Sequence, residues 1–423
     1  MNKTILLDQN KHWYSNIIYP FPITRAIFPD LLASMDLHLI TYLTGARRLG
    51  KSVLFHHLIN HLLYKKHIPQ KQILYYSFSP NSDLSEIWEL WEYYSREIAD
   101  LKKPIFIFLD EIQYISGYEN VIKQLYDTYP DLKISLTGSL SLSYKRRMQE
   151  SLAGRYQIFR LFPLSFYEFL EISNRPEYDF INFYKRNIHH EIKPSDWDYY
   201  LSQVDPTFRY FLHHWRYPEM LSLPESSHNA YLNSLIDASL SQDAFAYFNI
   251  HNPLLLRSIY EQLITQNGGL ISLAKLSSTS TSKTTSSYLD ILDLMGMVYL
   301  LYNGTSPTQK LNSKRKAYVN SAFFLNHSPY NVDTSMGLAV ESYILERLLT
   351  QNQEVSFYHH RQHELDFIVK NTKTAYEVKY RHNLPDFTEL FSYSAKHKYS
   401  PVIITRNKFL ESNQPSYIPA CLF

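Results

Sequence analysis

The chain is poor in cysteine and has no long apolar run. Its one cysteine, Cys421, cannot form a disulfide within the chain, which predicts a reducing compartment. The apolar run in the opening residues, MNKTILLDQNKHWY, is too short for a signal peptide. No stretch approaches the roughly 18 uninterrupted apolar residues that a membrane helix needs. We therefore expect a cytoplasmic protein that has no membrane partner.

The chain also lacks an excess of charge of either sign. Lys and Arg number 42 against 40 Asp and Glu, which gives a formal net charge of +2. This balance argues against a surface covered by nucleic-acid-binding charge, although local basic patches stay open. Hydrophobic residues make up 45% and charged residues 19%, which excludes a disordered chain. A globular chain of 423 residues predicts roughly two to four domains.

Glycine is scarce as well, with 10 residues, so a motif that contains two of them is informative. The segment GARRLGKS, residues 45–52, matches G-x-x-x-x-G-K-[ST], the phosphate-binding loop. A β-type run, residues 39–43, precedes this loop, and apolar residues at helical spacing follow it. Strand, loop and helix in this order are the context that the motif requires. We therefore expect a P-loop nucleotide site rather than a chance match on a turn.

Each residue type in this loop has a physical task. Gly45 and Gly50 let the backbone curl, so that N–H groups point at the β-phosphate, and the following helix adds its positive end. Lys51 is expected to reach the β- and γ-phosphates, and Ser52 to hold Mg²⁺. The predicted cofactors are therefore ATP and Mg²⁺. The predicted ATP-binding residues are Gly45, Ala46, Arg47, Arg48, Leu49, Gly50, Lys51, Ser52 and Val53.

Two further strand ends supply polar groups to the same chemistry. The segment PIFIFLDEIQ, residues 104–113, has a continuous apolar run typical of a strand that is buried on both faces. It ends in Asp110, a predicted Mg²⁺ ligand through water, and Glu111, predicted to polarise the attacking water. The next strand, in KISLTGSL, ends near Thr137 and Ser139. These two hydroxyls are expected to contact the water or the γ-phosphate, unless they only form a strand-end turn.

The segments DEIQ, LTGSLS and ESLAGRYQIFRLFPLSFYEFL together resemble a known family. It is the bacterial and archaeal family of AAA-type P-loop ATPases that carry a winged helix and a C-terminal PD-(D/E)XK nuclease-like domain. The resemblance covers nearly the whole chain and makes Arg155 a candidate γ-phosphate sensor or finger. The alternative for Arg155 is a salt-bridged helix end. The chain departs from the family at Trp215 and Arg216, where relatives usually carry Gly-Gly, which puts the local turn in doubt.

The family resemblance also implies a winged helix, and the residues of 268–304 are consistent with one. Leu270 to Leu276 suits a short helix, a second helix ends at Gly296, and MVYLLY reads as a strand. A basic segment follows, as expected of a wing that contacts DNA phosphates. The alternative is a winged helix used only for packing or for a partner protein. The candidate DNA-binding residues are Lys283, Lys310, Lys314, Arg315 and Lys316.

The segment HELDFIVKNTKTAYEVKY, residues 363–380, predicts a hairpin with charged side chains on one face. If residues 371–372 form its loop, Asp366 lies across from Glu377, and Glu364 lies across from Lys379. Alternation then places these four residues on one face. The residues expected on the other face are Leu365, Phe367, Tyr376 and Val378.

This arrangement is the D…E-x-K core of a PD-(D/E)XK nuclease-like fold. Asp366 and Glu377 are the candidate ligands of a second Mg²⁺, and Lys379 is expected to orient or activate water. Glu341, on a preceding helix, is a candidate further acid. The alternative is a charged, solvated face, but the two facing carboxylates repel each other unless a cation lies between them.

The sequence thus predicts an α/β chain in four parts. These are a P-loop AAA-type ATPase domain (1–165), a helical lid or connector (166–248), a winged-helix domain (249–325) and a restriction-endonuclease-like α/β domain (326–423). The leading hypothesis is Mg²⁺-dependent ATP hydrolysis coupled to a DNA-directed task, with nuclease activity left open. The alternative is a nucleotide-controlled switch that binds DNA or a partner protein through an inactive tail. The oligomeric state stays open.

Overall fold

The computed structural model describes every residue except 1, 139–153, 187–195, 197–198, 249, 251, 278–279, 305–313, 352–353, 362, 382, 407 and 409–415. Two of the predicted site residues, Ser139 and Lys310, lie outside the described residues. The chain divides into two compact units. Unit 1 comprises Met1–Leu161 and Ala238–His251, and unit 2 comprises Phe162–Asp237 and Asn252–Phe423.

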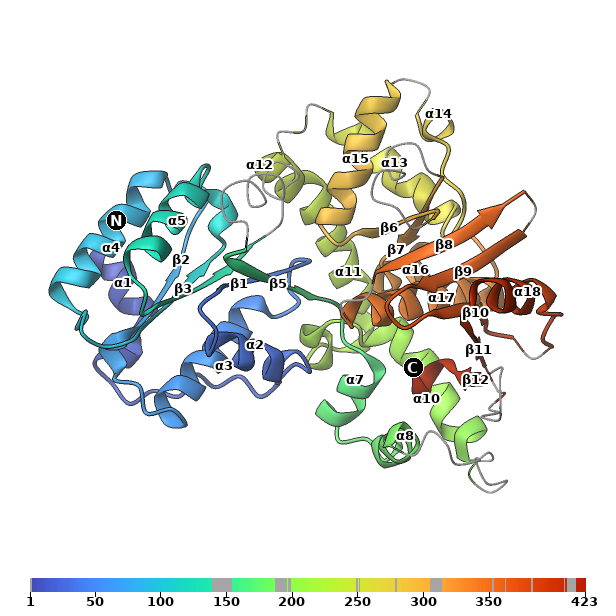
Figure 1. Cartoon of the computed structure of the whole chain (residues 1–423), viewed down its shortest axis with the longest axis horizontal. Coiled ribbons are helices and arrows are strands. Elements are labelled where there is room, and N and C mark those ends of the chain that lie inside the picture. The colour runs from blue at the N-terminus through green and yellow to red at the C-terminus, as the bar shows by residue number, and fades with distance from the viewer. Residues whose placement is uncertain are drawn as a thin grey trace. The chain divides into compact units, whose positions relative to one another are not determined.

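Unit 1 contains a parallel five-stranded sheet with the order β2-β3-β4-β1-β5. Strands β1 and β3 are buried along their whole length because helices cover both faces, whereas the edge strand β5 is mostly half-buried. The strands are β1 (Ile40–Gly45), β2 (Ile73–Ser77), β3 (Ile105–Asp110), β4 (Leu132–Thr137) and β5 (Tyr156–Leu161). The helices are α1 (Lys3–Gln9), α2 (Phe28–Met35), α3 (Lys51–Tyr64), α4 (Leu84–Glu97) and α5 (Tyr118–Thr128). In Figure 1, α4 and α5 lie on one side of this sheet, and α2 and α3 lie on the other.

Unit 2 contains a mixed five-stranded sheet with the order β12-β11-β10-β9-β8. Strands β8, β9 and β10 are antiparallel neighbours, whereas β10, β11 and β12 run parallel. The strands are β8 (Val355–His360), β9 (His363–Val369), β10 (Thr374–Lys379), β11 (Ser400–Thr405) and β12 (Ser416–Pro419). The helices that accompany this sheet are α16 (Ser321–His327), α17 (Val332–Thr350) and α18 (Thr388–His397).

The segment predicted as a connector is helical where the structure describes it, and the next segment places two strands after three helices. The first segment holds α7 (Phe166–Ile172), α8 (Glu177–Arg186), α10 (Asp205–His214) and α11 (His228–Asp237). The second holds α13 (Pro253–Thr265), α14 (Leu273–Leu276), α15 (Ser282–Leu294), β6 (Val298–Tyr302) and β7 (Arg315–Val319). Strands β6 and β7 pair antiparallel, and Leu270 forms an isolated bridge with Lys316.

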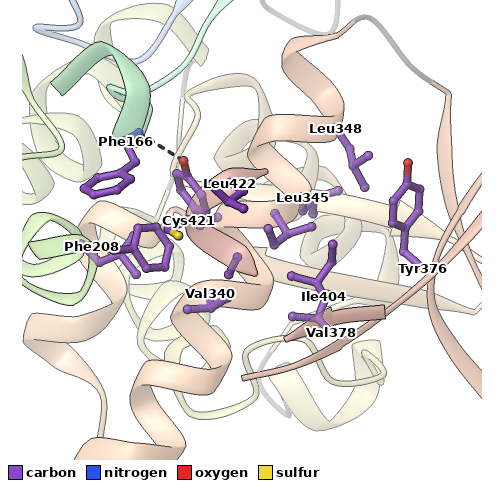
Figure 2. Packing of buried hydrophobic residues seen from close by; sticks show 14 of the residues in the cluster. Phe166, Phe208, Val340, Leu345, Leu348, Tyr376, Val378, Ile404, Cys421 and Leu422 are labelled. Atoms are coloured by element: carbon purple, nitrogen blue, oxygen red, sulfur yellow. Dashed lines mark hydrogen bonds between the residues drawn. The ribbon is translucent and has the colours of Figure 1, made fainter. Parts of the chain in front are cut away.

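One hydrophobic cluster joins distant parts of unit 2. Phe166 of α7, Phe208 of α10, Val340 of α17 and Ile404 of β11 all belong to it (Figure 2). The Tyr343 hydroxyl accepts the Phe166 N–H at 3.1 Å. The predicted connector and nuclease-like parts therefore share a core, although the sequence pattern separates them.

The doubt over Trp215 and Arg216 is resolved by their backbone and their contacts. Trp215 has φ −133° and ψ 40°, and this negative φ does not require glycine. The Arg216 guanidinium is fully buried and pairs with Glu346 of α17, where both side chains are 2% exposed. It also donates to the Ser321 Oγ and to the Leu164 carbonyl. Arg216 therefore ties together three segments that lie far apart in the sequence.

Candidate functional site

The predicted phosphate loop lies between the carboxyl end of β1 and the start of α3. Gly45 and Gly50 have φ of 152° and 96°. A Cβ on Gly45 would lie 2.5 Å from the Leu161 carbonyl oxygen, so no larger residue fits there. Lys51 is 7% exposed, and its ammonium donates to the carbonyls of Gly45 (3.1 Å) and Ala46 (3.0 Å). Lys51 is therefore held inside the loop that is expected to surround the phosphates.

The donor groups at this loop fit a phosphate. Helix α3 is 14 residues long, and Gly50 at its N-cap offers no side-chain hydrogen bond to the first-turn N–H groups. These N–H groups carry the partial positive charge of the helix and can point at an anion. The buried Lys51 ammonium adds a full positive charge beside them. A di- or triphosphate is the kind of ligand that this set of donors recognises.

Asp110 and Glu111 lie at the carboxyl end of β3, and Thr137 lies at the end of the neighbouring β4. The Thr137 hydroxyl donates to Asp110 and accepts the Glu111 N–H at 3.0 Å. Gln113 donates to the Glu111 carboxylate, and Glu111 has φ 56°. The order β3-β4-β1 brings this group to the same edge of the sheet as Lys51. The predicted contact of Thr137 with the attacking water stays a prediction, because its hydrogen bonds here go to Asp110 and Glu111.

Tyr75 of β2 was not predicted as a site residue, but it holds Asp110 in place. Its hydroxyl donates to Asp110 Oδ2 at 2.7 Å, and the His56 ring lies 4.7 Å from its ring. Burial first, and then the Asp110 charge, raise the pKa of Tyr75, so the hydroxyl stays protonated and donates. His56 also bonds the Ser52 carbonyl at 2.9 Å, which links α3 to this corner. Tyr75 lies beside Asp110 because β2 and β3 are neighbours in the sheet, and the local sequence does not reveal this strand order.

Arg155 does not lie at the phosphate loop of its own chain. It precedes β5, where Tyr156 pairs with Ile40 at the start of β1, whereas Gly45 pairs with Leu161 at the other end. Five residues along a strand span about 17 Å. Arg155 instead forms an ion pair with Asp127 of α5 at 2.9 Å. A sensor role within the chain is therefore wrong. The alternative, a salt-bridged helix end, holds for the ion pair but not for the position, because Arg155 precedes a strand. The role of a finger stays a prediction.

The hairpin of unit 2 has the predicted register. Val369 pairs with Thr374 and Phe367 pairs with Tyr376, as a two-residue loop at 371–372 requires. The prediction that Leu365 shares a face with Phe367 is wrong. Leu365 packs in the smaller core cluster and Phe367 in the larger one. The physical reason is a register irregularity between β8 and β9, which breaks the alternation of β9 at this point.

A cation of the chain itself lies between the two facing carboxylates. Lys379 Nζ is 2.6 Å from Glu377 Oε1 and 3.4 Å from Asp366 Oδ2. Asp366 also accepts the Val378 N–H at 2.8 Å. Burial acts to lower the pKa of Lys379, but the two carboxylates outweigh it and raise that pKa. The repulsion that the sequence suggested is therefore offset by Lys379.

The acids around this lysine are perturbed. Burial, and then the Asp366 charge, raise the pKa of Glu341 to about 8 and of Glu377 to about 7. Tyr318 donates to Glu341 at 2.8 Å. Among the described residues, no group of three or more His, Cys, Asp and Glu is arranged to hold a metal. A metal here would rest on Asp366 and Glu377 together with water. The oxygen donors suit Mg²⁺, but Lys379 competes for them.

A hollow of about 560 Å³ opens beside this group on unit 2. Glu341 and Lys379 line it together with two arginines, Arg381 and Arg406. Its other lining residues are Asp333, Thr334, Gly337, Leu338, Val378 and Tyr380. Its three basic groups lie beside two acids, Asp333 and Glu341, and both Lys379 and Arg406 already pair with carboxylates, so the lining does not favour a ligand of one charge.

Glu364 pairs with Lys316, one of the predicted DNA-binding lysines, and not with Lys379 as predicted. Lys316 is 1% exposed, and its ammonium lies 2.5 Å from Glu364 Oε1. A buried ammonium cannot contact a DNA phosphate, so the predicted role of Lys316 is wrong. Arg315 is half-buried and donates to the Ser286 hydroxyl at 2.8 Å. Of the described candidates, Lys283 and Lys314 are exposed.

Comparison with known proteins bears on the first of these sites. Residues 38–170 match the model of the family described as AAA domain. These residues contain the phosphate loop, Asp110 and Glu111. This part of the chain is therefore similar to an AAA domain. Residues 206–331 match a second family, described as a domain of unknown function.

Two relatives extend over more of the chain. An uncharacterized protein of Haemophilus influenzae is 22% identical over 254 residues, which are 60% of this chain and 58% of that protein. The chain thus spans less than two thirds of this relative. An uncharacterized protein of Methanocaldococcus jannaschii is 23% identical over 360 residues, 82% of this chain and 75% of that protein. Neither relative carries a function over to this chain.

Two solved structures resemble this chain weakly. A chain of the S. cerevisiae Hsp104:casein complex in its extended conformation gives a TM-score of 0.30 at 13% identity, over 63% of this chain and 48% of that one. C. elegans PCH-2 gives 0.23 at 14% identity, over 35% and 43%. Similarity at this level carries no argument about function. Within the described residues, the chain has no helix of the length and apolarity that crossing a membrane requires.

Proposed function

We propose that this chain is a Mg²⁺-dependent ATPase whose cycle serves a DNA-directed task. The observation that carries the proposal is the meeting of Lys51, Asp110 and Glu111 at one edge of a single parallel sheet. Thr137, on the strand between β1 and β3, bonds both Asp110 and the Glu111 N–H. The AAA match over residues 38–170 supports the nucleotide-binding part.

The residues of this edge divide the chemistry between them. The loop N–H groups and Lys51 bind and orient the phosphates, and Ser52 and Asp110 would hold the metal. Mg²⁺, when bound, neutralises charge on the β- and γ-phosphate oxygens. Glu111 is the base that orients the attacking water, and Gln113 fixes its carboxylate by a hydrogen bond. Tyr75 and Thr137 hold Asp110 from two sides.

Turnover of ATP measured with and without DNA tests the coupling. We expect DNA to stimulate hydrolysis, because the proposed task couples the two. Hydrolysis that is indifferent to DNA would favour the alternative, a nucleotide-controlled switch that acts on a partner protein. The Lys379 ammonium between Asp366 and Glu377 is the observation that favours an inactive tail in that alternative.

A surface built from α15 and the start of β7 is proposed to contact DNA phosphates. Replacing Lys283 and Lys314 by Ala should weaken DNA binding and flatten its dependence on salt. The slope of log K against log salt should fall by about 2, because each phosphate contact contributes about 0.9. The slope is obtained by measuring DNA affinity at salt concentrations from about 50 to about 200 mM.

The matched control replaces Lys102 and Lys396, which are also exposed, so it removes the same charge elsewhere. Equal slopes for both double variants would move the DNA surface away from α15 and β7. Lys316 is left unchanged, because removing its buried ammonium would leave Glu364 without its partner.

The metal hypothesis for the hairpin predicts stabilisation by Mg²⁺ without nucleotide. A ligand that binds only the folded state raises its stability, so the melting temperature of unit 2 should rise by about 2–4 °C. Asp366→Ala should abolish this rise and any metal-dependent DNA cleavage, and leave ATP hydrolysis intact. Glu354→Ala is the matched control, because it removes an exposed carboxylate of the same unit and leaves the buried Lys316 with its partner. If Mg²⁺ shifts wild type and Asp366→Ala equally, Asp366 is not a ligand.

A further inference from the structure

A short segment outside the AAA match reaches the phosphate loop. The segment Ala238–His251 belongs to unit 1, although the chain on both sides of it belongs to unit 2. It forms a π-helical turn, η7 (Ala238–Asp243), and helix α12 (Ala244–Phe248). Helix α12 packs against η3 (Ile112–Tyr114), which directly follows Glu111. Single π-helical turns occur frequently at functional sites.

The last residue of the π-helical turn pairs with the phosphate loop. Asp243 Oδ1 accepts a hydrogen bond from Arg47 Nη1 at 2.9 Å, and the two side chains are 16% and 43% exposed. Burial raises the pKa of Asp243, the charges of Arg47 and Lys51 act to lower it, and Glu111 acts to raise it. The Asp243 carboxylate therefore lies within electrostatic range of three predicted nucleotide-site residues.

The Arg47 pair, and the packing of α12 on η3 directly after Glu111, are the contacts that put Asp243 on the side of the site where the γ-phosphate is expected. Lys51 is expected to reach the β- and γ-phosphates, and Glu111 acts on the water that attacks the γ-phosphate. A carboxylate near both groups repels a γ-phosphate more than it repels a β-phosphate, because Coulomb energy falls with distance. It also competes with the phosphate for Arg47.

We propose that Asp243 is a specificity-determining residue that disfavours ATP relative to ADP by competing with the γ-phosphate for the cations of the loop. This inference rests on the proposed function. When the γ-phosphate arrives, the Arg47–Asp243 pair must open or share Arg47. Both ends of Ala238–His251 continue into unit 2. The polypeptide chain therefore connects that unit directly to the residue that competes with the γ-phosphate.

Binding of two nucleotides to the full chain tests the proposal. Affinities for ADP and for a non-hydrolysable ATP analogue, both with Mg²⁺, are measured for wild type and for Asp243→Asn, which removes the charge and keeps the shape. We expect the analogue to bind about tenfold tighter to the variant and ADP to change by less than about twofold. Asp237→Asn is the matched control, because Asp237 also pairs with an arginine, Arg257, and should change neither affinity.

Three results overturn the proposal. Equal changes in affinity for the analogue and for ADP would mean that Asp243 acts on both nucleotides alike. No change in either affinity would mean that the Arg47–Asp243 pair is only structural. Weaker binding of the analogue would mean that Asp243 contributes to ATP binding. Asp243→Ala serves as a second variant with the same expectation if Asp243→Asn does not melt like wild type. Failure of wild type to bind any nucleotide would overturn the proposed function itself, and this inference with it. If nucleotides bind but the ratio of the two affinities is the same in wild type and variant, only the inference is overturned.

Discussion

Replacing Glu111 by Gln is expected to lower the rate of ATP hydrolysis by about a hundredfold or more and to leave ATP binding near its wild-type affinity. An amide oxygen can still accept the hydrogen bond that Gln113 donates to Glu111. It is a far weaker base than a carboxylate, so the attacking water loses its activation. Phosphate release under saturating ATP and equilibrium nucleotide binding are the two measurements.

Two other variants complete this experiment. Lys51→Ala removes the buried ammonium of the loop and should weaken or abolish nucleotide binding, so that hydrolysis fails for a different reason. Glu97→Gln makes the same carboxylate-to-amide change at an exposed position at the end of α4 and should behave like wild type. Wild-type hydrolysis by Glu111→Gln would show that Glu111 is not the base.

Replacing Glu346 by Ala is expected to destabilise unit 2 by about 3–5 kcal/mol. The substitution leaves the Arg216 guanidinium buried without its carboxylate, and an uncompensated buried charge is costly. The Ser321 N–H loses its acceptor as well, because Glu346 Oε1 accepts it at 2.9 Å. Urea denaturation of the full chain, followed by a signal from unit 2, measures the loss.

The matched control for Glu346 is an exposed ion pair in the same unit. Asp237→Ala removes a carboxylate that is 61% exposed and pairs with Arg257, and it should cost less than about 1 kcal/mol. Replacing both members of the buried pair, Arg216→Met with Glu346→Leu, should cost less than Glu346→Ala alone. If Glu346→Ala costs no more than Asp237→Ala, the buried pair does not hold α17 to the chain around Arg216.

Interactions between residues close in sequence were predictable, because they depend on short chain segments. The phosphate loop needs only its two glycines and the strand and helix beside it, and the structure places Gly45 and Gly50 at φ values that favour glycine. The hairpin register followed from a two-residue loop and the alternation of side chains, and Phe367 pairs with Tyr376 as expected. The α/β architecture with a parallel P-loop sheet was likewise predicted.

Predictions for single side chains failed where a distant segment supplies the neighbour. Lys316 belongs to a basic stretch, yet it is buried because Glu364, 48 residues further along the chain, lies beside it. Arg155 belongs to a family motif, yet β5 runs parallel to β1. Arg155 therefore lies at the start of these strands, whereas the phosphate loop lies at their carboxyl end. The Leu365 prediction failed because a register irregularity with β8 interrupts the regular alternation.

From its residues alone, the chain specifies a nucleotide loop, a buried strand that ends in two acids, and a charged hairpin. These features are local, since backbone conformation and side-chain alternation over a few residues determine them. Tertiary packing adds the partners: Tyr75 beside Asp110, Asp243 beside Arg47, and Lys379 between Asp366 and Glu377. The strand order brings Tyr75 to Asp110. The segment Ala238–His251, which belongs to unit 1 although its flanking residues belong to unit 2, brings Asp243 to Arg47. The members of each pair are far apart in the chain, so the linear sequence does not show that they lie close together.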